Sequence, residues 1–116
     1  MYKKGIDNSD LSPKKYQRIY QLGRFYTIVN NPDKALESFN QALELQPGYS
    51  KAMFEKAKIL FSIEQKDAAK IILLQITDLD PTFLKAYEQL MDIERSNENY
   101  KKALDYGNMC LDFNPT

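Results

Sequence analysis

The chain of 116 residues has no histidine and a single cysteine, Cys110. Without histidine there can be no serine–histidine or cysteine–histidine nucleophile pair and no histidine metal site. One cysteine excludes an internal disulfide and a four-thiolate zinc site. The N-terminus, Met1 to Gly5, also lacks the apolar stretch of a signal peptide. Together these absences favour a reduced, cytoplasmic setting.

The sequence also has no surplus of charge and no long apolar run. Sixteen basic residues balance sixteen acidic ones, so a nucleic-acid partner is not expected. The balance is uneven along the chain: residues 1–34 carry seven positive and three negative charges, and residues 84–116 carry four and six. The longest apolar run is the four residues 71–74, far below the roughly 20 that a membrane span needs. We therefore expect no membrane association.

What is present is an internal repeat. Three alanines and three prolines each recur at intervals of 34 residues, and each alanine precedes its proline by twelve: Ala35, Ala69, Ala103 and Pro47, Pro81, Pro115. Such a period indicates a stack of similar units. The predicted units are residues 16–49, 50–83 and 84–116. They form one domain over residues 13–116, preceded by a flexible arm over residues 1–12.

Each unit is predicted to contain two helices and no strand. The first helix should start at Ser12-Pro13, an N-cap followed by proline. Its apolar stripe is Ile19, Leu22, Gly23 and Tyr26. Asn30 suits a left-handed turn, and a second helix follows. In the middle unit the helices are predicted over residues 50–63 and 66–79. The fold class is therefore all-α.

These units resemble the tetratricopeptide repeat family. The first unit carries most of that pattern, and the other two keep parts of it: Leu22, Gly23, Tyr26, Ala35, Phe39, Ala42, Pro47; Ala57, Leu60, Ala69, Pro81; Tyr87, Leu90, Tyr100, Ala103, Pro115. The third unit departs at Met91, Glu94 and Gly107. The resemblance implies a right-handed α-solenoid of three helix-turn-helix units, six antiparallel helices in all. It further implies a concave groove and a non-enzymatic role in protein–protein interaction.

In this family the first helix of each unit lines the groove, which implies a set of partner-binding residues here. The set is Gln17, Tyr20, Arg24, Thr27, Lys51, Phe54, Lys58, Phe61, Lys85, Glu88, Asp92 and Arg95. The aromatic members would anchor a partner peptide or helix, and the basic members would attract its acidic groups. The alternative interpretation is that the aromatics belong partly to the core and the charges to a solvated face.

Some family members grip a peptide carboxylate with a clamp of lysine, asparagine and arginine. The corresponding positions here are Tyr20, Arg24, Glu55, Lys85 and Gln89. Only Lys85 matches, and Glu55 would repel a carboxylate. The sequence therefore disfavours a chaperone-tail clamp.

An enzyme is not supported, because the sequence has no glycine-rich phosphate loop and no nucleophile–base pair. No cofactor and no metal are expected, and Cys110 is interpreted as a packing residue. A second hypothesis is a self-associating scaffold or a piece of a larger repeat protein. This hypothesis rests on a C-terminal face that is predicted to have no helix packed on it. The face is formed by Leu90, Met91, Leu104, Cys110 and Leu111. Glu94 lies on the same face, and the small residue Gly107 leaves a slot in it.

Overall fold

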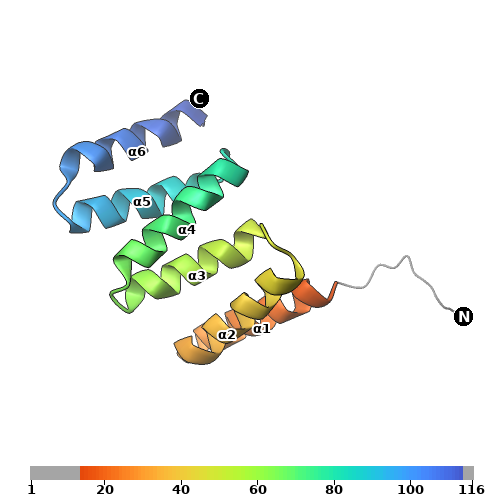
Figure 1. Ribbon diagram of the computed structural model, residues 1–116. Coiled ribbons are helices and arrows are strands. Elements are labelled where there is room, and N and C mark those ends of the chain that lie inside the picture. The colour runs from red at the N-terminus through yellow and green to blue at the C-terminus, as the bar shows by residue number, and fades with distance from the viewer. Residues whose placement is uncertain (1–13, 114–116) are drawn as a thin grey trace, which may run out of the picture.

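The structure, a computed structural model, describes residues 14–113 of the chain. In that range it has six α-helices and no strand (Figure 1). The helices are α1 (Lys15–Ile28), α2 (Pro32–Leu45), α3 (Ser50–Ser62), α4 (Lys66–Leu79), α5 (Leu84–Ser96) and α6 (Tyr100–Phe113). The all-α prediction is confirmed, and the two helices predicted for the middle unit match α3 and α4 to within one residue.

The start of the first helix differs from the prediction. Helix α1 begins at Lys15, and Lys14 takes the N-cap position. The Lys14 backbone N–H donates to Gln17 Oε1 at 3.0 Å, which satisfies one of the groups left free at the start of a helix. The predicted cap at Ser12-Pro13 and the predicted arm lie outside the described residues.

One turn geometry recurs at the 34-residue period between the helices of each pair. Asn30, Glu64 and Glu98 all have positive φ, between 61° and 68°. The next residue in each turn donates its N–H to a carbonyl five residues earlier, as in Asn31 to Tyr26 at 2.8 Å. This is the left-handed helix ending that asparagine tolerates, and it confirms the expectation for Asn30. In the other two turns glutamate takes the same conformation.

The two helices of each unit lie side by side and antiparallel, and successive pairs stack along the molecule (Figure 1). In the first pair the contact is very close, because a Cβ built on Gly23 would lie 2.7 Å from Phe39 Cε1. Phe39 is completely buried. The small residue at position 23 is therefore what allows the Phe39 ring to lie between α1 and α2.

The core forms at the junctions between units as well as inside them. Ala52 and Ile59 of α3 belong to the core cluster of the first unit, together with Phe39. Ala86 and Ile93 of α5 belong to the cluster of the second unit. Helices α3 and α5 therefore each bury one face against the preceding pair, which is how stacked repeats make a continuous core.

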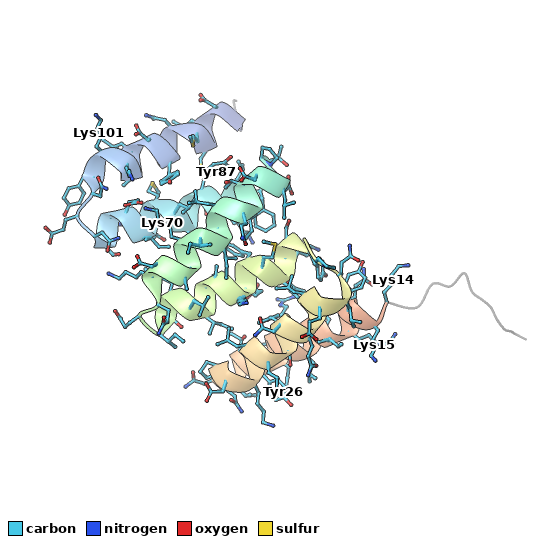
Figure 2. The ribbon with its side chains drawn as sticks, viewed as in Figure 1. Lys14, Lys15, Tyr26, Lys70, Tyr87 and Lys101 are labelled. Carbon is cyan, nitrogen blue, oxygen red and sulfur yellow. The ribbon has the colours of Figure 1, made fainter. Side chains whose placement is uncertain are left out.

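Three residues lie differently from the predictions. Leu22, assigned to the core stripe, is exposed, because no helix precedes α1 in the described part of the chain. Leu90 and Glu94, assigned to the open C-terminal face, are buried, because that side of α5 packs on the second unit. Glu94 Oε2 lies 2.6 Å from the Nζ of Lys70, and Figure 2 shows Lys70 on α4. The hydrogen bond to Glu94 raises the pKa of Lys70.

Candidate functional site

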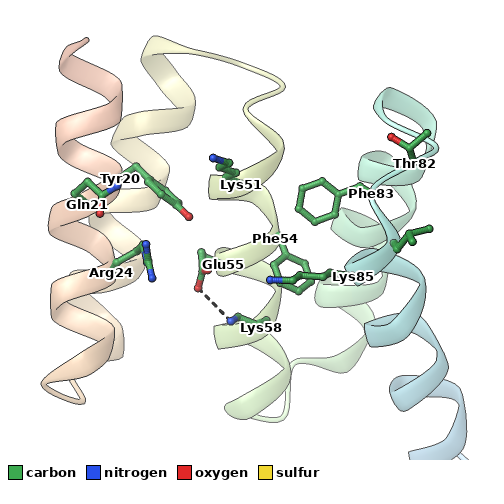
Figure 3. Close-up of a pocket in the computed structure, with 11 residues that line it drawn as sticks. Tyr20, Gln21, Arg24, Lys51, Phe54, Glu55, Lys58, Thr82, Phe83 and Lys85 are labelled. Atoms are coloured by element: carbon green, nitrogen blue, oxygen red, sulfur yellow. Dashed lines mark ion pairs between the residues drawn. The ribbon is translucent and has the colours of Figure 1, made fainter. Parts of the chain in front are cut away.

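The first helices of all three units border a groove of about 580 Å³ (Figure 3). Helix α1 contributes one wall, α3 the floor, and the start of α5 with the residues before it the other wall. The eleven lining residues are Tyr20, Gln21, Arg24, Lys51, Phe54, Glu55, Lys58, Thr82, Phe83, Leu84 and Lys85. Six of the twelve predicted site residues are therefore brought together: Tyr20, Arg24, Lys51, Phe54, Lys58 and Lys85.

Aromatic rings form the base of this groove. Tyr20 and Phe54 are buried, so these two rings belong largely to the core, as in the alternative interpretation of the sequence. The Tyr20 ring packs against Tyr49, with centroids 5.3 Å apart, and the Phe54 ring packs against Phe83 at 5.4 Å. Edge contacts of this kind hold rings in fixed positions. The rings thus present a rigid apolar floor, with only a small part of Tyr20 and Phe54 facing the groove.

Basic side chains surround this floor. Four of the lining residues are cations and one is an anion, which leaves a formal surplus of three positive charges. Glu55 pairs with Lys58 at 3.4 Å, and Lys58 Nζ also lies 5.2 Å from the centre of the Phe54 ring. Arg24, Lys51 and Lys85 make no ion pair within the described residues. These three cations remain available for an acidic ligand.

Tyr20 places a neutral hydroxyl at the wall of the groove. Burial, and to a smaller extent the nearby Glu55 carboxylate, raises the pKa of the Tyr20 phenol above its ordinary value. The phenol therefore keeps its proton at neutral pH and can both donate and accept a hydrogen bond.

A second hollow of about 420 Å³ continues the groove along α1 and includes the predicted residue Gln17. It shares Tyr20, Gln21 and Lys51 with the main groove. Because the two hollows share these three lining residues, they form one continuous surface.

The other five predicted residues do not line the groove. Thr27 donates its hydroxyl to the Gly23 carbonyl at 3.1 Å, and Phe61 packs against the core cluster of the second unit. Asp92 and Arg95 form an exposed pair at 2.7 Å, and Glu88 is exposed on α5. On α5 the predicted stripe leaves the groove, because this helix contributes only its first turn to the lining.

The predicted set of groove residues did not include Gln21, Thr82, Phe83 and Leu84, and the sequence analysis considered Glu55 only as a clamp position. Thr82 and Phe83 precede α5, and a stripe drawn on the helices alone does not reach them. The signal was nevertheless present, because Tyr49 and Phe83 occupy the same position 34 residues apart. Both rings pack on groove aromatics, so these two junction residues support the floor.

Residues outside the groove offer little further chemistry. Cys110 is partly buried with its Sγ 3.8 Å from the Leu84 carbonyl oxygen, and burial chiefly raises the pKa of its thiol. A thiol of that kind is a poor nucleophile. Among residues 14–113, no three His, Cys, Asp or Glu side chains cluster as metal ligands would. None of the described helices has the length and apolar character required to cross a bilayer.

Comparisons with known proteins agree with this architecture. A family model described as Tetratricopeptide repeat matches residues 29–92. Tetratricopeptide repeat protein 21A of Mus musculus is 25% identical over 95 residues, which is 82% of this chain but only 7% of that protein. The chain thus spans a small part of the length of this curated relative.

Solved structures show the same fold at low sequence identity. MamA superimposes with a TM-score of 0.80 at 18% identity, covering 84% of this chain and 57% of that one. The first repeat domain of Spaghetti (RPAP3), bound to the HSP90 peptide SRMEEVD, also has a TM-score of 0.80, at 16% identity, covering 88% and 81%. Its second repeat domain, with the same peptide, reaches 0.78 at 13% identity, covering 84% and 91%.

Proposed function

We propose that this chain, which belongs to the tetratricopeptide repeat family, holds an extended acidic segment of a partner protein in its concave groove. Repeats of this family are protein-interaction modules rather than catalytic ones. What we propose for this chain is the kind of partner segment it binds and the place where that segment binds. One observation carries it: three unpaired cations surround a fixed aromatic floor in a groove of about 580 Å³.

The arrangement favours a particular kind of segment. The exposed edges of Tyr20, Phe54 and Phe83 accept one apolar side chain, because a rigid aromatic surface gains contact area at little entropic cost. Lys51 stands at the start of α3 on the floor of the groove, and Lys85 stands on the wall formed by the start of α5 (Figure 3). They suit acidic side chains on either side of that apolar residue. Glu55 is held by Lys58, so its repulsion of an acidic ligand is reduced.

A carboxylate-terminal clamp remains disfavoured for this groove. Two RPAP3 repeat domains of similar fold bind an HSP90 peptide, but their identity to this chain is at most 16%. Here Tyr20 and Glu55 occupy positions at which the clamp pattern needs lysine and asparagine. The proposed ligand is therefore an internal acidic segment with an apolar centre.

The experiment measures binding of fluorescent peptides by anisotropy. The probe has an aromatic residue flanked by glutamates, and the reference peptides replace either the aromatic by serine or the glutamates by glutamine. We expect the probe to bind more tightly than both references and its affinity to fall with added salt, since exposed charges are screened. Equal binding of all three peptides would contradict the proposal.

The matched variants reverse charge without touching the core. Lys51→Glu and Lys85→Glu together should weaken probe binding by about tenfold or more. Lys101→Glu and Lys102→Glu form the control, because these exposed lysines lie on α6 away from the groove. Phe54→Ala is avoided, since Phe54 is buried and its loss would also destabilise the fold. A single-stranded RNA that binds better than any peptide would assign the groove to nucleic acid instead.

A further inference from the structure

The face that α3 and α5 bury against the preceding unit also exists on α1, where none of residues 14–113 covers it. Ile59 and Ile93 are buried at the two internal junctions. Counting back by 34 residues, the corresponding residue of α1 is Phe25, which is 55% exposed. Leu22 on the same side of α1 corresponds to the fully buried Leu90. Helix α1 thus carries the side chains of a junction, and no other helix of the described residues covers them.

The second internal junction shows which residues meet across such a contact. From α4, Lys66 Nζ lies 3.5 Å from Asn97 Oδ1, just after the end of α5. One turn further on, Lys70 Nζ lies 2.6 Å from Glu94 Oε2. The start of a second helix therefore meets the end of the next first helix, and the two run antiparallel.

The same register can be transferred to the two ends of the molecule. Thirty-four residues after Lys66 and Lys70 come Tyr100 and Leu104 of α6. Sixty-eight residues, or two repeat periods, before Asn97 and Glu94 are Val29, the C-cap residue of α1, and Tyr26. Leu104 is 68% exposed, and Tyr100 and Val29 are also exposed. The two polar pairs of the second junction, Lys66–Asn97 and Lys70–Glu94, thus correspond to two apolar pairs, Tyr100–Val29 and Leu104–Tyr26. In each apolar pair one residue lies near one end of the chain and the other lies near the opposite end.

We propose that a second copy of this chain docks head to tail, with α6 of one copy packing on α1 of the next. The contact repeats the geometry of the internal junctions. Leu104 would lie against Tyr26 of the neighbouring copy, and Tyr100 against its Val29. In the structure Tyr26 and Lys101 mark the two opposite ends of the stack (Figure 2), so one chain cannot join its own ends.

Charge complementarity favours a copy of the same chain as the occupant. Helix α1 has three cations and no acid, and Lys15 and Arg18 lie in its first half. In the second half of α6, residues 107–113, the only charged residue is Asp112. The antiparallel register brings the start of α1 to the end of α6, where the helix dipole is also negative. The basic end of one copy therefore meets the acidic end of the next.

The two faces differ, so the contact is heterologous. Each added copy leaves one free face at either end, and such a contact does not close unless its rotation forms a ring. The mean size of the assemblies should therefore increase with protein concentration. The concave groove is formed by a different side of α1 and stays open, so this inference is independent of peptide binding.

Sedimentation velocity over a concentration series tests this interface with three variants. Phe25→Glu blocks the N-terminal face and Leu104→Glu blocks the C-terminal face. Ile71→Glu is the matched control, because Ile71 is 60% exposed on α4 and belongs to neither end. We expect the unmodified chain and Ile71→Glu to form assemblies that grow with concentration, and the other two variants each to stay monomeric. Circular dichroism checks that every variant is folded, and Val29→Glu or Tyr100→Glu replaces one that is not.

Mixing the two blocked variants gives the decisive result. Phe25→Glu keeps its α6 face and Leu104→Glu keeps its α1 face, so an equimolar mixture should form a discrete heterodimer and nothing larger. A monomeric unmodified chain at every concentration would overturn the inference. So would assembly that Leu104→Glu abolishes and Phe25→Glu leaves intact, because the C-terminal faces would then pair symmetrically. Peptide binding in the groove should be unchanged in all these variants.

Discussion

The first and third units make the same helix–helix contact with the large and small residues exchanged. In the first unit Gly23 on α1 faces Phe39 on α2; in the third, Met91 on α5 faces Gly107 on α6. The middle unit has Ala57 and Leu73 at these positions, both fully buried. Each unit therefore keeps the combined volume of the two facing side chains roughly constant, because protein interiors are close-packed.

The exchange has different consequences at the two ends. A Cβ on Gly23 would meet the ring of Phe39, which is completely buried and has no room to move. A Cβ on Gly107 would meet the Met91 Sδ at 3.2 Å, near the end of a flexible side chain. The first unit should therefore tolerate enlargement poorly, and the third should tolerate it well.

The largest expected effect is at Gly23. Gly23→Leu should lower the free energy of unfolding by about 3 kcal/mol, because the added side chain has to displace the Phe39 ring. Urea denaturation followed by circular dichroism measures it. Asn40→Leu, at an exposed position of α2, is the control and should change stability by less than about 0.5 kcal/mol. Equal stability of the Gly23 variant and the unmodified chain would contradict the assignment of this contact.

The next effect concerns the junction that attaches the third unit. Lys70→Ala should cost about 2 kcal/mol, because it leaves the buried Glu94 carboxylate without its partner while water can still reach the site of Lys70. The double variant Lys70→Leu with Glu94→Leu copies Leu36 and Leu60, which occupy these positions in the first two units. We expect it to be at least as stable as the unmodified chain in the same urea experiment. A double variant weaker than Lys70→Ala would show that the ion pair is needed.

A smaller effect tests the volume exchange directly. Gly23→Ala should destabilise the unmodified chain but be nearly neutral when Phe39 is replaced by leucine, because that pair reproduces Ala57 and Leu73 of the middle unit. The coupling energy between the two substitutions should be about 1 kcal/mol, measured from thermal melts of the four proteins in a double-mutant cycle. Additive effects would mean that the two positions do not share one space.

The smallest expected effect is a gain. Gly107→Ala should raise stability by about 0.5 kcal/mol, because alanine favours the helix by about 1 kcal/mol and Met91 needs only a small shift. Differential scanning calorimetry should show a higher melting temperature. A lower melting temperature would mean that the third unit is packed as tightly as the first, and the contrast between the two ends would disappear.

Much of the groove could not be located from the sequence, for reasons visible in particular residues. A helical stripe identifies which residues share a face, and this assigned Arg24, Lys51, Lys58 and Lys85 to one surface. It does not show where that face ends. Glu88 and Asp92 continue the stripe on α5 but lie beyond the groove, since the stacked units rotate relative to one another. Phe54 satisfies both the groove pattern and the core pattern, and only its burial in the core cluster of the second unit shows that it is mostly core.

The 34-residue period and the helical stripes inside each unit predicted two helices per unit and the position of their turns, and the resemblance to the repeat family implied their antiparallel pairing. Such features depend on residues close in sequence, and they recur whenever the local pattern recurs. The tertiary structure decided what each repeated position touches. Glu94 is an exposed charge in the pattern and a buried ion-pair partner in the fold, because Lys70 lies opposite it on the preceding unit. Leu22 is a core position in the pattern and exposed in the fold, because no helix precedes α1 in the described part of the chain. The burial of a side chain depends on which helix packs against it, and the sequence of one helix does not specify that packing partner.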